Sequence, residues 1–325
     1  GFVQLRQAQR ALQDGFTTLR TVGETAITNR SYIDLKEAIH RGEFIGPRLY
    51  GAPYQWSPTG GHFDINGFAK DGFVSIQGSA VASGEDAVRE AVREAIKYGA
   101  DWIKIAASGG VMSEHDDVNV AGFTQEEINA FADETHRYKK KITAHVHGNA
   151  GALMVAKAGF DGIEHGTMLE DDALKLMKKN KVWLVPTVSI VDSVAARCTE
   201  PDHPQRPSQS SCEKIMEVKK KRDISFRKAY KKGINIAFGV DAIYGVQDNP
   251  KEFAALVNLG VTEFDAIQMA TINSATMMGL EQELGSIRTG KLADIVAVPG
   301  NPLEDISEME RVHFVMKEGG VYRND

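Results

Sequence analysis

Hydrophobic and polar residues follow two periods along this chain, one typical of helices and one typical of strands. Residues Phe2 to Asp14 repeat apolar positions at helical spacing and end at Gly15, and the β-branched run FTTLRTVG that follows predicts a strand. Helix and strand patterns then alternate, with seven core strands predicted near residues 18, 50, 104, 144, 163, 185 and 238. This alternation indicates parallel strands joined by right-handed crossovers.

The expected fold class is α/β, and the expected architecture is a (β/α)8 TIM barrel over residues 1–283. Such a barrel needs eight strands. The chain opens with a helix, so the strand expected to be missing from this chain is the first. An open doubly wound sheet is the rival architecture, and it is disfavoured because no glycine-rich nucleotide fingerprint follows an early strand.

The last 42 residues, 284–325, differ in character from the barrel pattern. They contain two short strand patterns, a turn-rich link and a Gly-Gly hairpin signal. We expect a small β appendage, whose strands pair with others N-terminal to residue 1, because two or three strands cannot bury a face alone.

The remaining pattern predicts further elements by their residue ranges. Thr124 with Glu127 forms a capping box, which predicts a helix start. Other helices are expected at 32–41, 85–98, 170–180, 213–232, 250–259 and 263–278, strands at 182–189 and 235–240, a loop at 53–67, and an irregular insertion at 197–212.

Composition narrows the class of protein. The 325 residues carry a formal net charge of −6, so neither a nucleic-acid partner nor an anionic membrane is indicated. No apolar run approaches the length of a membrane span. The two cysteines, Cys198 and Cys212, do not make a disulfide scaffold; a bridge between them stays open, and a reducing, cytoplasmic compartment is the default expectation. A leader upstream of Gly1 also stays open.

Three histidines mark the stretch that organises the chain, KITAHVHGNAGALMVAKAGFDGIEHG, residues 141–166. His145 and His147 lie on one face of a predicted strand because side chains alternate, and His165 ends the next strand. Chemistry in α/β folds sits at the carboxyl ends of parallel strands, and neutral imidazole is the commonest metal ligand. The alternative is a set of buried, hydrogen-bonded histidines without a metal.

Lys104 and Asp241 stand at the ends of two other predicted strands. An isolated ammonium is costly to bury, and carbamylation by carbon dioxide would turn Lys104 into an anionic oxygen ligand. The alternatives are a lysine that reaches solvent or pairs with an acid, and an Asp241 that only caps a helix or turn.

Together these residues resemble the amidohydrolase superfamily of metal-dependent barrel hydrolases. The nearest group looks like the Xaa-Pro dipeptidases and zinc-dependent arginine or lysine carboxypeptidases, with ochratoxinase a more distant relative. The matching stretches cover essentially the whole chain: GFTTLRTVG, AIHRGEFIGPRL, TGGHFD, ADWIKIAASGGVMS, AHVHG, GIEHG, FGVDA and GKLADIVAVPGNPLEDI.

The resemblance implies a role for each strand-end residue. Lys104 resembles a carbamylated lysine that bridges two divalent ions, zinc above all, and His145 and His165 resemble the ligands of the second ion. Asp241 resembles the aspartate that binds the first ion and serves as general acid and base. The implied reaction is cleavage of an amide or peptide bond in a dipeptide or N-acyl amino acid by a metal-activated water, within a homo-oligomer.

The implied substrate contacts lie on two loops and one strand. His62, in TGGHFD, matches a position that polarises the scissile carbonyl or contacts substrate; the alternative is a flexible surface imidazole. His147 is expected to face substrate, and Gly110, Val111 and Met112 of the SGGVMS loop are expected to line the pocket, where glycine lets the backbone approach a ligand closely.

One departure from the family pattern limits this reading. The family carries a His-x-His pair on its first strand, whereas no histidine precedes His40 here. We expect a truncated chain or a partial gene, because the other motifs are intact. Two alternatives stay open: cyclic amide ring opening or deamination by a related enzyme, and a catalytically crippled metal-binding barrel.

Overall fold

The computed structural model describes residues 2–23, 31–64, 80–113, 116–242 and 248–325. Its helices are α1 (Phe2–Gln13), α2 (Ser31–His40), α3 (Glu85–Lys97), α4 (Gln125–Arg137), α5 (Asn149–Ala158), α6 (Asp171–Asn180), α7 (Val188–Thr199), α8 (Gln209–Lys231), α9 (Lys251–Asn258), α10 (Glu263–Gln268) and α11 (Ser274–Met278). Its strands are β1 (Thr18–Val22), β2 (Arg48–Ala52), β3 (Trp56–Ser57), β4 (Ala80–Val81), β5 (Trp102–Ala106), β6 (Lys141–Gly148), β7 (Gly162–Met168), β8 (Trp183–Val185), β9 (Ile295–Ala297), β10 (Phe314–Lys317) and β11 (Gly320–Asn324).

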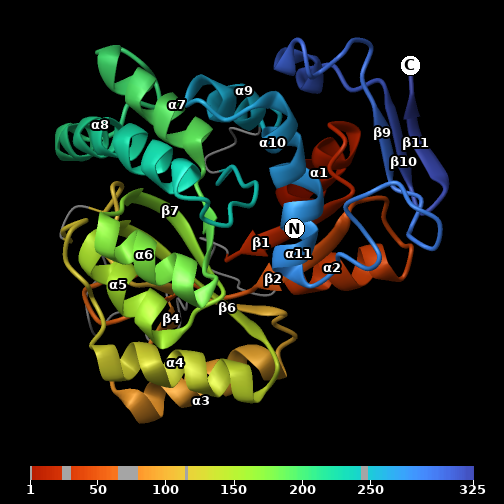
Figure 1. The fold of residues 1–325 in the computed structure, drawn as a ribbon. Coiled ribbons are helices and arrows are strands. Elements are labelled where there is room, and N and C mark those ends of the chain that lie inside the picture. Colours follow the sequence, from red (N-terminus) through yellow and green to blue (C-terminus); the bar gives the residue numbers. More distant parts are fainter. Residues whose placement is uncertain (1, 24–30, 65–79, 114–115, 243–247) are drawn as a thin grey trace.

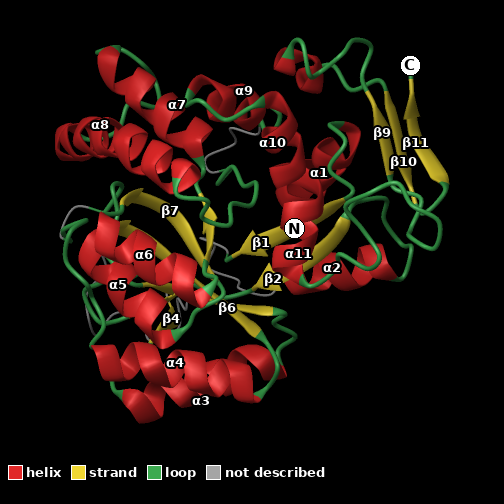
Figure 2. Cartoon of the chain, viewed as in Figure 1, coloured by secondary structure: helices red, strands yellow, loops and turns green. Residues whose placement is uncertain are grey.

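A parallel sheet in the order β4-β3-β5-β6-β7-β8 forms the centre of the molecule (Figure 2). All residues of β5 and β7 are buried, as expected for parallel strands covered by helices. Figure 1 shows α3, α4, α5 and α6 along one side of this sheet. In the register, Ala106 lies opposite His145, and Val146 lies opposite His165. The predicted α/β class with parallel strands is confirmed.

β1 and β2 form a second parallel pair beside this sheet. The Asp101 amide donates to the Gly51 carbonyl oxygen at 2.9 Å, which holds β2 next to the start of β5. At the other end, Ile236 makes an isolated parallel bridge to Leu184. Within the described residues, no strand ladder joins the segment around Ile236 to β1.

The strand predicted at 235–240 is wrong, because only Ile236 forms a bridge to a neighbouring strand. The Phe238 amide donates to the Met269 carbonyl oxygen at 3.1 Å and to Ser274 Oγ at 3.2 Å, so it is not available to a strand partner. Met269 and Ser274 lie within the segment 263–278, which was predicted as one helix. That helix is interrupted by a π-helical turn, Met269–Asn273, between α10 and α11.

The helix starts follow local signals that the sequence carries. Thr124 Oγ1 accepts from the Glu127 amide at 3.2 Å, and the Glu127 carboxylate accepts from the Thr124 amide at 2.8 Å. These two hydrogen bonds confirm the capping box at α4. The other Glu127 carboxylate oxygen accepts from the Gly84 amide at 2.6 Å, just before α3. One buried glutamate therefore fixes the starts of two neighbouring helices.

The segment between β8 and α8 is more helical than predicted. The expected strand at 182–189 ends at Val185, and α7 begins at Val188, so the irregular insertion shrinks to residues 200–208. Ser208 Oγ accepts from the Ser211 amide at 3.3 Å, which starts the basic helix α8 at Gln209, four residues earlier than expected. A disulfide joins Cys198 of α7 to Cys212 of α8, settling a pairing that the sequence left open.

The C-terminal tail forms an antiparallel sheet in the order β11-β10-β9, beside α1 (Figure 1). Leu12 of α1 packs against Val312 and Val315 of the tail, and Arg48 forms a salt bridge of 2.6 Å with Asp294. The small β appendage is confirmed as an element of the fold. The division at residue 283 and the pairing with strands upstream of Gly1 stay predictions.

Two further expectations meet the limits of what the structure describes. The loop predicted at 53–67 contains the short strand β3, and its last three residues, 65–67, lie outside the described residues. No helix in the described ranges is both long and apolar enough to cross a membrane.

Candidate active site

Four imidazoles gather where β5, β6 and β7 end. The ring centroid of His145 lies 4.8 Å from that of His165, 4.7 Å from that of His147, and 4.4 Å from that of His62, which stacks on it. His145, His147 and His165 are buried. Burial, and then the neighbouring cationic groups, lower the pKa values of His145 and His165 well below their usual range. Both rings are therefore neutral at pH 7, which is the form that ligates metals.

Lys104 is buried in β5, two residues before the strand ends. No hydrogen bond or salt bridge of Lys104 Nζ is found among the described residues, although only 3% of the residue is exposed. Burial lowers the pKa of the Lys104 ammonium, and the nearby carboxylates of Glu164 and Asp241 only partly oppose this shift. A desolvated lysine with a lowered pKa has more of the neutral amine, the form that reacts with carbon dioxide.

Asp241 follows the Ile236 segment and completes the set. Burial raises the pKa of its carboxyl group, whereas the charge of Lys104 lowers it. The residue is nevertheless accessible to solvent.

The backbone is left-handed at three positions: His165 within β7, Thr187 just after β8, and Asp241 after the Ile236 segment. His165, Thr187 and Asp241 have φ values of 70°, 46° and 50°. Such conformations cost non-glycine residues about 1–3 kcal/mol each, and they persist where the surrounding structure enforces them, often at functional sites. The strain turns the ends of β7, β8 and the Ile236 segment, and it is a reason to locate function here.

Hydroxyl groups orient two of the histidines. Thr187 Oγ1 lies 2.7 Å from His165 Nδ1, and Thr167 Oγ1 lies 2.9 Å from His147 Nδ1. These contacts engage Nδ1 of each histidine and not Nε2. The sequence analysis missed both threonines, because a hydroxyl residue near a strand end carries no pattern of its own.

His62 belongs to the same cluster, so it is not a free surface imidazole. Its Nδ1 lies 2.8 Å from Ser113 Oγ and 3.6 Å from Asp116 Oδ2. A Cβ atom at Gly110 would overlap the His62 ring, so only glycine at that position allows this approach. Glycine at position 110 was predicted to let a ligand approach the backbone closely. In the structure, the group that approaches Gly110 is the His62 ring.

A buried ion pair lies next to the histidines. Arg20 donates to Glu164 Oε1 at 2.6 Å, Thr143 Oγ1 donates to the same oxygen at 2.6 Å, and the guanidinium lies over the Trp102 ring. Although burial opposes ionisation, Arg20 and Lys104 hold the pKa of Glu164 below its usual value. The sequence analysis missed this pair, since Arg20 and Glu164 lie 144 residues apart.

The loop residues predicted to bind substrate occupy different surroundings. Val111 is buried in an apolar cluster with Val118 and residues of α7 and α8, and Met112 packs against the same cluster. Val111 therefore supports the loop from the side of α7 and α8. Substrate contact by Gly110, Val111, Met112 and His147 stays a prediction.

The donor set fits a divalent metal that relies on a modified lysine. No three His, Cys, Asp or Glu side chains in the described ranges are arranged to hold a metal by themselves. Two neutral imidazoles, a carboxylate and an unpaired buried lysine do meet here, and carbamylation would add the missing anionic oxygen donors. The structure thus brings His145 and His165 together, and the charge of Lys104 acts on both His165 and Asp241; the roles of all four as ligands stay predictions.

Known proteins match nearly the whole of this chain. A model of the Amidohydrolase family matches residues 2–321. Ochratoxinase of Aspergillus niger is 31% identical over 335 residues, covering 98% of this chain and 68% of that protein. A crystal structure of a Xaa-Pro dipeptidase with methionine in its active site is 39% identical with a TM-score of 0.92, covering 99% of this chain and 79% of that one.

A prolidase structure complexed with N-methylphosphonate-L-proline is also similar, with 29% identity and a TM-score of 0.89 over 100% of this chain and 79% of that one. The resemblance to the dipeptidase and ochratoxinase group is thereby confirmed. Since the family model spans nearly the whole described chain and relatives match it end to end, this chain belongs to the amidohydrolase family.

Proposed function

We propose that this protein is a metal-dependent hydrolase that cleaves an amide or peptide bond of a small substrate, a dipeptide or an N-acyl amino acid. One observation carries the proposal: neutral His145 and His165 lie 4.8 Å apart, and the buried Lys104 interacts electrostatically with both rings and with Asp241. The similarity to a Xaa-Pro dipeptidase and to ochratoxinase supports the substrate class.

The metal ligands would be Lys104 as its carbamate, His145, His165 and Asp241, and the ion would be zinc. A divalent ion held there supplies a Lewis acid that activates water and polarises a carbonyl group. The left-handed backbone at His165 and Asp241 turns both side chains at the strand ends, and Thr187 fixes the ring of His165.

Two residues of this chain would move or hold protons. The carboxylate of Asp241 would accept a proton from the attacking water and return it to the leaving amine; burial raises its pKa, which strengthens it as a base. His62 would present Nε2 to the scissile carbonyl, because Ser113 and Asp116 engage its Nδ1. Stacking on His145 keeps that imidazole beside the metal ligands.

The test combines metal analysis with substrate screening. The protein, supplied with zinc and bicarbonate, should hydrolyse members of a panel of Xaa-Pro dipeptides, other dipeptides and N-acyl amino acids. Lys104→Met should lose bound zinc and activity, and ¹³C-bicarbonate should give a carbamate NMR signal in the wild type alone. Zinc that binds equally well to Lys104→Met would refute the assignment of the ligands, and release of ammonia from nucleobases in place of peptide cleavage would refute the substrate class.

A further inference from the structure

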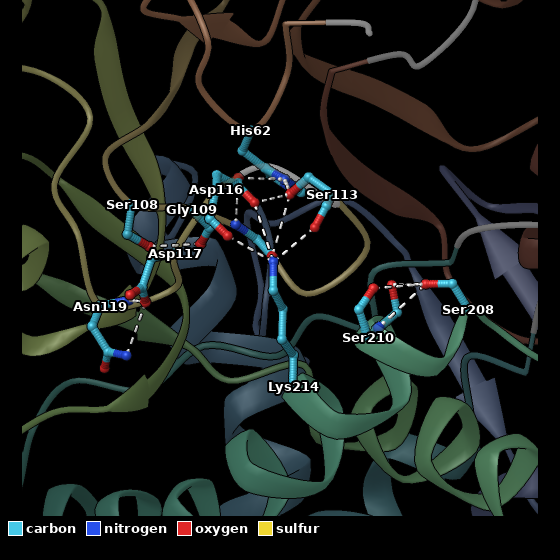
Figure 3. Close-up of polar contacts among 12 residues, drawn as sticks. His62, Ser108, Gly109, Ser113, Asp116, Asp117, Asn119, Ser208, Ser210 and Lys214 are labelled. Atoms are coloured by element: carbon cyan, nitrogen blue, oxygen red, sulfur yellow. Dashed lines mark hydrogen bonds and ion pairs between the residues drawn. The ribbon is translucent and has the colours of Figure 1, made fainter. Parts of the chain in front are cut away.

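Lys214 extends from the first turns of α8 into the loop that follows β5 (Figure 3). Its Nζ donates to the carbonyl oxygens of Ser113 and Asp116, both at 2.7 Å, and lies 3.4 Å from that of Gly110 and 3.5 Å from Asp116 Oδ1. Four acceptors of one loop thus surround a single ammonium. Lys219, Lys221 and Lys228 of α8 form salt bridges with carboxylates on helices, so the contacts with loop carbonyl groups set Lys214 apart from them.

Residues of the same loop contact the side chain of His62. The Asp116 carboxylate accepts from the Gly110 amide at 2.9 Å and from Ser113 Oγ, and both side chains face His62 Nδ1. Although burial opposes ionisation, the hydrogen bonds from His62 and Ser113 hold the pKa of Asp116 well below its usual value. The contacts form a continuous path from Lys214 to the imidazole that stacks on His145.

Apolar packing and a disulfide hold the base of this path. Val111 and Val118 of the loop pack against Ile215 of α8 and Val194 of α7, within one apolar cluster. The disulfide of Cys212, two residues before Lys214 on α8, ties that helix to α7. Val111, Val118, α7 and α8 therefore share one packed cluster, and Lys214 joins α8 to the loop beside His62 through polar contacts.

We propose that Lys214 and Asp116 are positioning residues for the hydrolysis: Lys214 fixes the loop, and Asp116 fixes the ring of His62. The inference rests on the proposed function, because it gives the His62 imidazole a task at the scissile carbonyl. Neither residue touches the metal ligands. Their loss therefore displaces His62 while leaving the metal in place.

Steady-state kinetics test this assignment. Lys214→Met should lower kcat by about 10²-fold, the loss that a misplacement of about 1 Å causes, with zinc content unchanged. Asp116→Asn should act in the same direction. The matched control is Lys221→Met on the same helix, because Lys221 binds only the exposed Glu217 at 2.6 Å and should leave kcat unchanged.

A double-mutant cycle separates positioning from general damage. In a His62→Ala background, Lys214→Met should have little further effect on kcat, because both changes remove the same placed imidazole. If the two losses multiply, Lys214 does not act through His62 and the assignment is overturned. An unchanged kcat for Lys214→Met also overturns it.

Hydrogen exchange provides a readout that needs no turnover. Lys214→Met should raise amide exchange by about tenfold in the loop at 108–113 and 116–122 and also in the His62 segment at 56–64, because a hydrogen bond to a charged group is worth about that factor. Lys221→Met should raise neither. If no peptide is cleaved but exchange rises at both segments, the proposed function fails and the positioning contact stands; unchanged exchange at 56–64 overturns the inference.

Discussion

Gly110 is the position where a single methyl group should most directly disturb the candidate active site. A Cβ atom there would overlap the ring of His62, whereas no left-handed φ is recorded for Gly110, so alanine fits its backbone. The ring would have to retreat by roughly 1 Å or more to regain a contact of about 3.5 Å between carbon atoms. That retreat breaks its 2.8 Å contact with Ser113 and its stacking on His145.

The expected size of the effect follows from this displacement. A misplacement of about 1 Å costs about 10²-fold in rate, which is about 2.7 kcal/mol of transition-state stabilisation. Overpacking by one methyl group costs about 1–3 kcal/mol of folding free energy. Gly110→Ala should therefore lower kcat/KM about 10²-fold on the best dipeptide substrate while the protein stays folded and retains its zinc.

The assay compares kcat/KM, zinc content and thermal unfolding for Gly110→Ala and for Gly320→Ala. Gly320, in the C-terminal hairpin, also shows no left-handed φ, and a Cβ there would meet its nearest atom at an ordinary 3.4 Å. The control should be unchanged in all three measurements. Unchanged kcat/KM for Gly110→Ala, at normal zinc content, would refute the argument that His62 must approach this glycine.

Three further perturbations have directions that the structure sets. Thr187→Val removes the hydroxyl that holds His165 and should weaken zinc affinity by about 10- to 100-fold, measured by competition with a chelator. Glu164→Gln leaves the buried Arg20 without its carboxylate and should lower the unfolding free energy by about 3–5 kcal/mol in urea titrations. Burial raises the pKa of Glu252 to about 7, so the folded state holds a proton that the unfolded state releases near the ordinary value of 4.5. Glu252 therefore contributes stability that is complete below pH 4.5 and is lost as pH rises through about 7, by about 3 kcal/mol, and Glu252→Gln should lack this fall.

Each of these three predictions has a result that contradicts it. Thr199→Val, which loses a hydroxyl on the exposed end of α7, is the control for Thr187, and equal zinc affinities for both variants would remove the orienting role. Glu43→Gln breaks an exposed pair with Arg41 and should change stability little; a Glu164→Gln variant as stable as Glu43→Gln would show that the buried pair adds nothing. A wild-type pH slope that persists in Glu252→Gln would assign the titration to another group.

The sequence predicted those features that local pattern encodes. Alternation along β6 placed His145 and His147 on one face, and the structure shows their rings 4.7 Å apart. The capping box at Thr124 predicted the start of α4. These signals depend on neighbours within a few residues, so they survive without knowledge of the tertiary fold.

What the sequence could not predict depends on contacts between distant segments. Arg20 meets Glu164 across 144 residues, and Lys214 meets Ser113 across 101. The strand expected at 235–240 failed for the same reason, since Met269 and Ser274 capture the Phe238 amide. Candidate ligands could be identified from strand ends, but the residues that hold them could not.

The strained conformation of Thr187 leaves the start of α7 without a side-chain cap of its own, and Glu252 of α9 caps it instead. Thr187 adopts a left-handed conformation to hold His165, and its side chain therefore does not cap α7, which begins one residue later. The fully buried carboxylate of Glu252, on α9, accepts from the Val188 and Ser189 amides at 2.8 and 2.7 Å and takes over that task. Disturbing Glu252 should therefore reach beyond stability: as α7 frays, Thr187 loses its enforced geometry, and His165 loses its orientation with it.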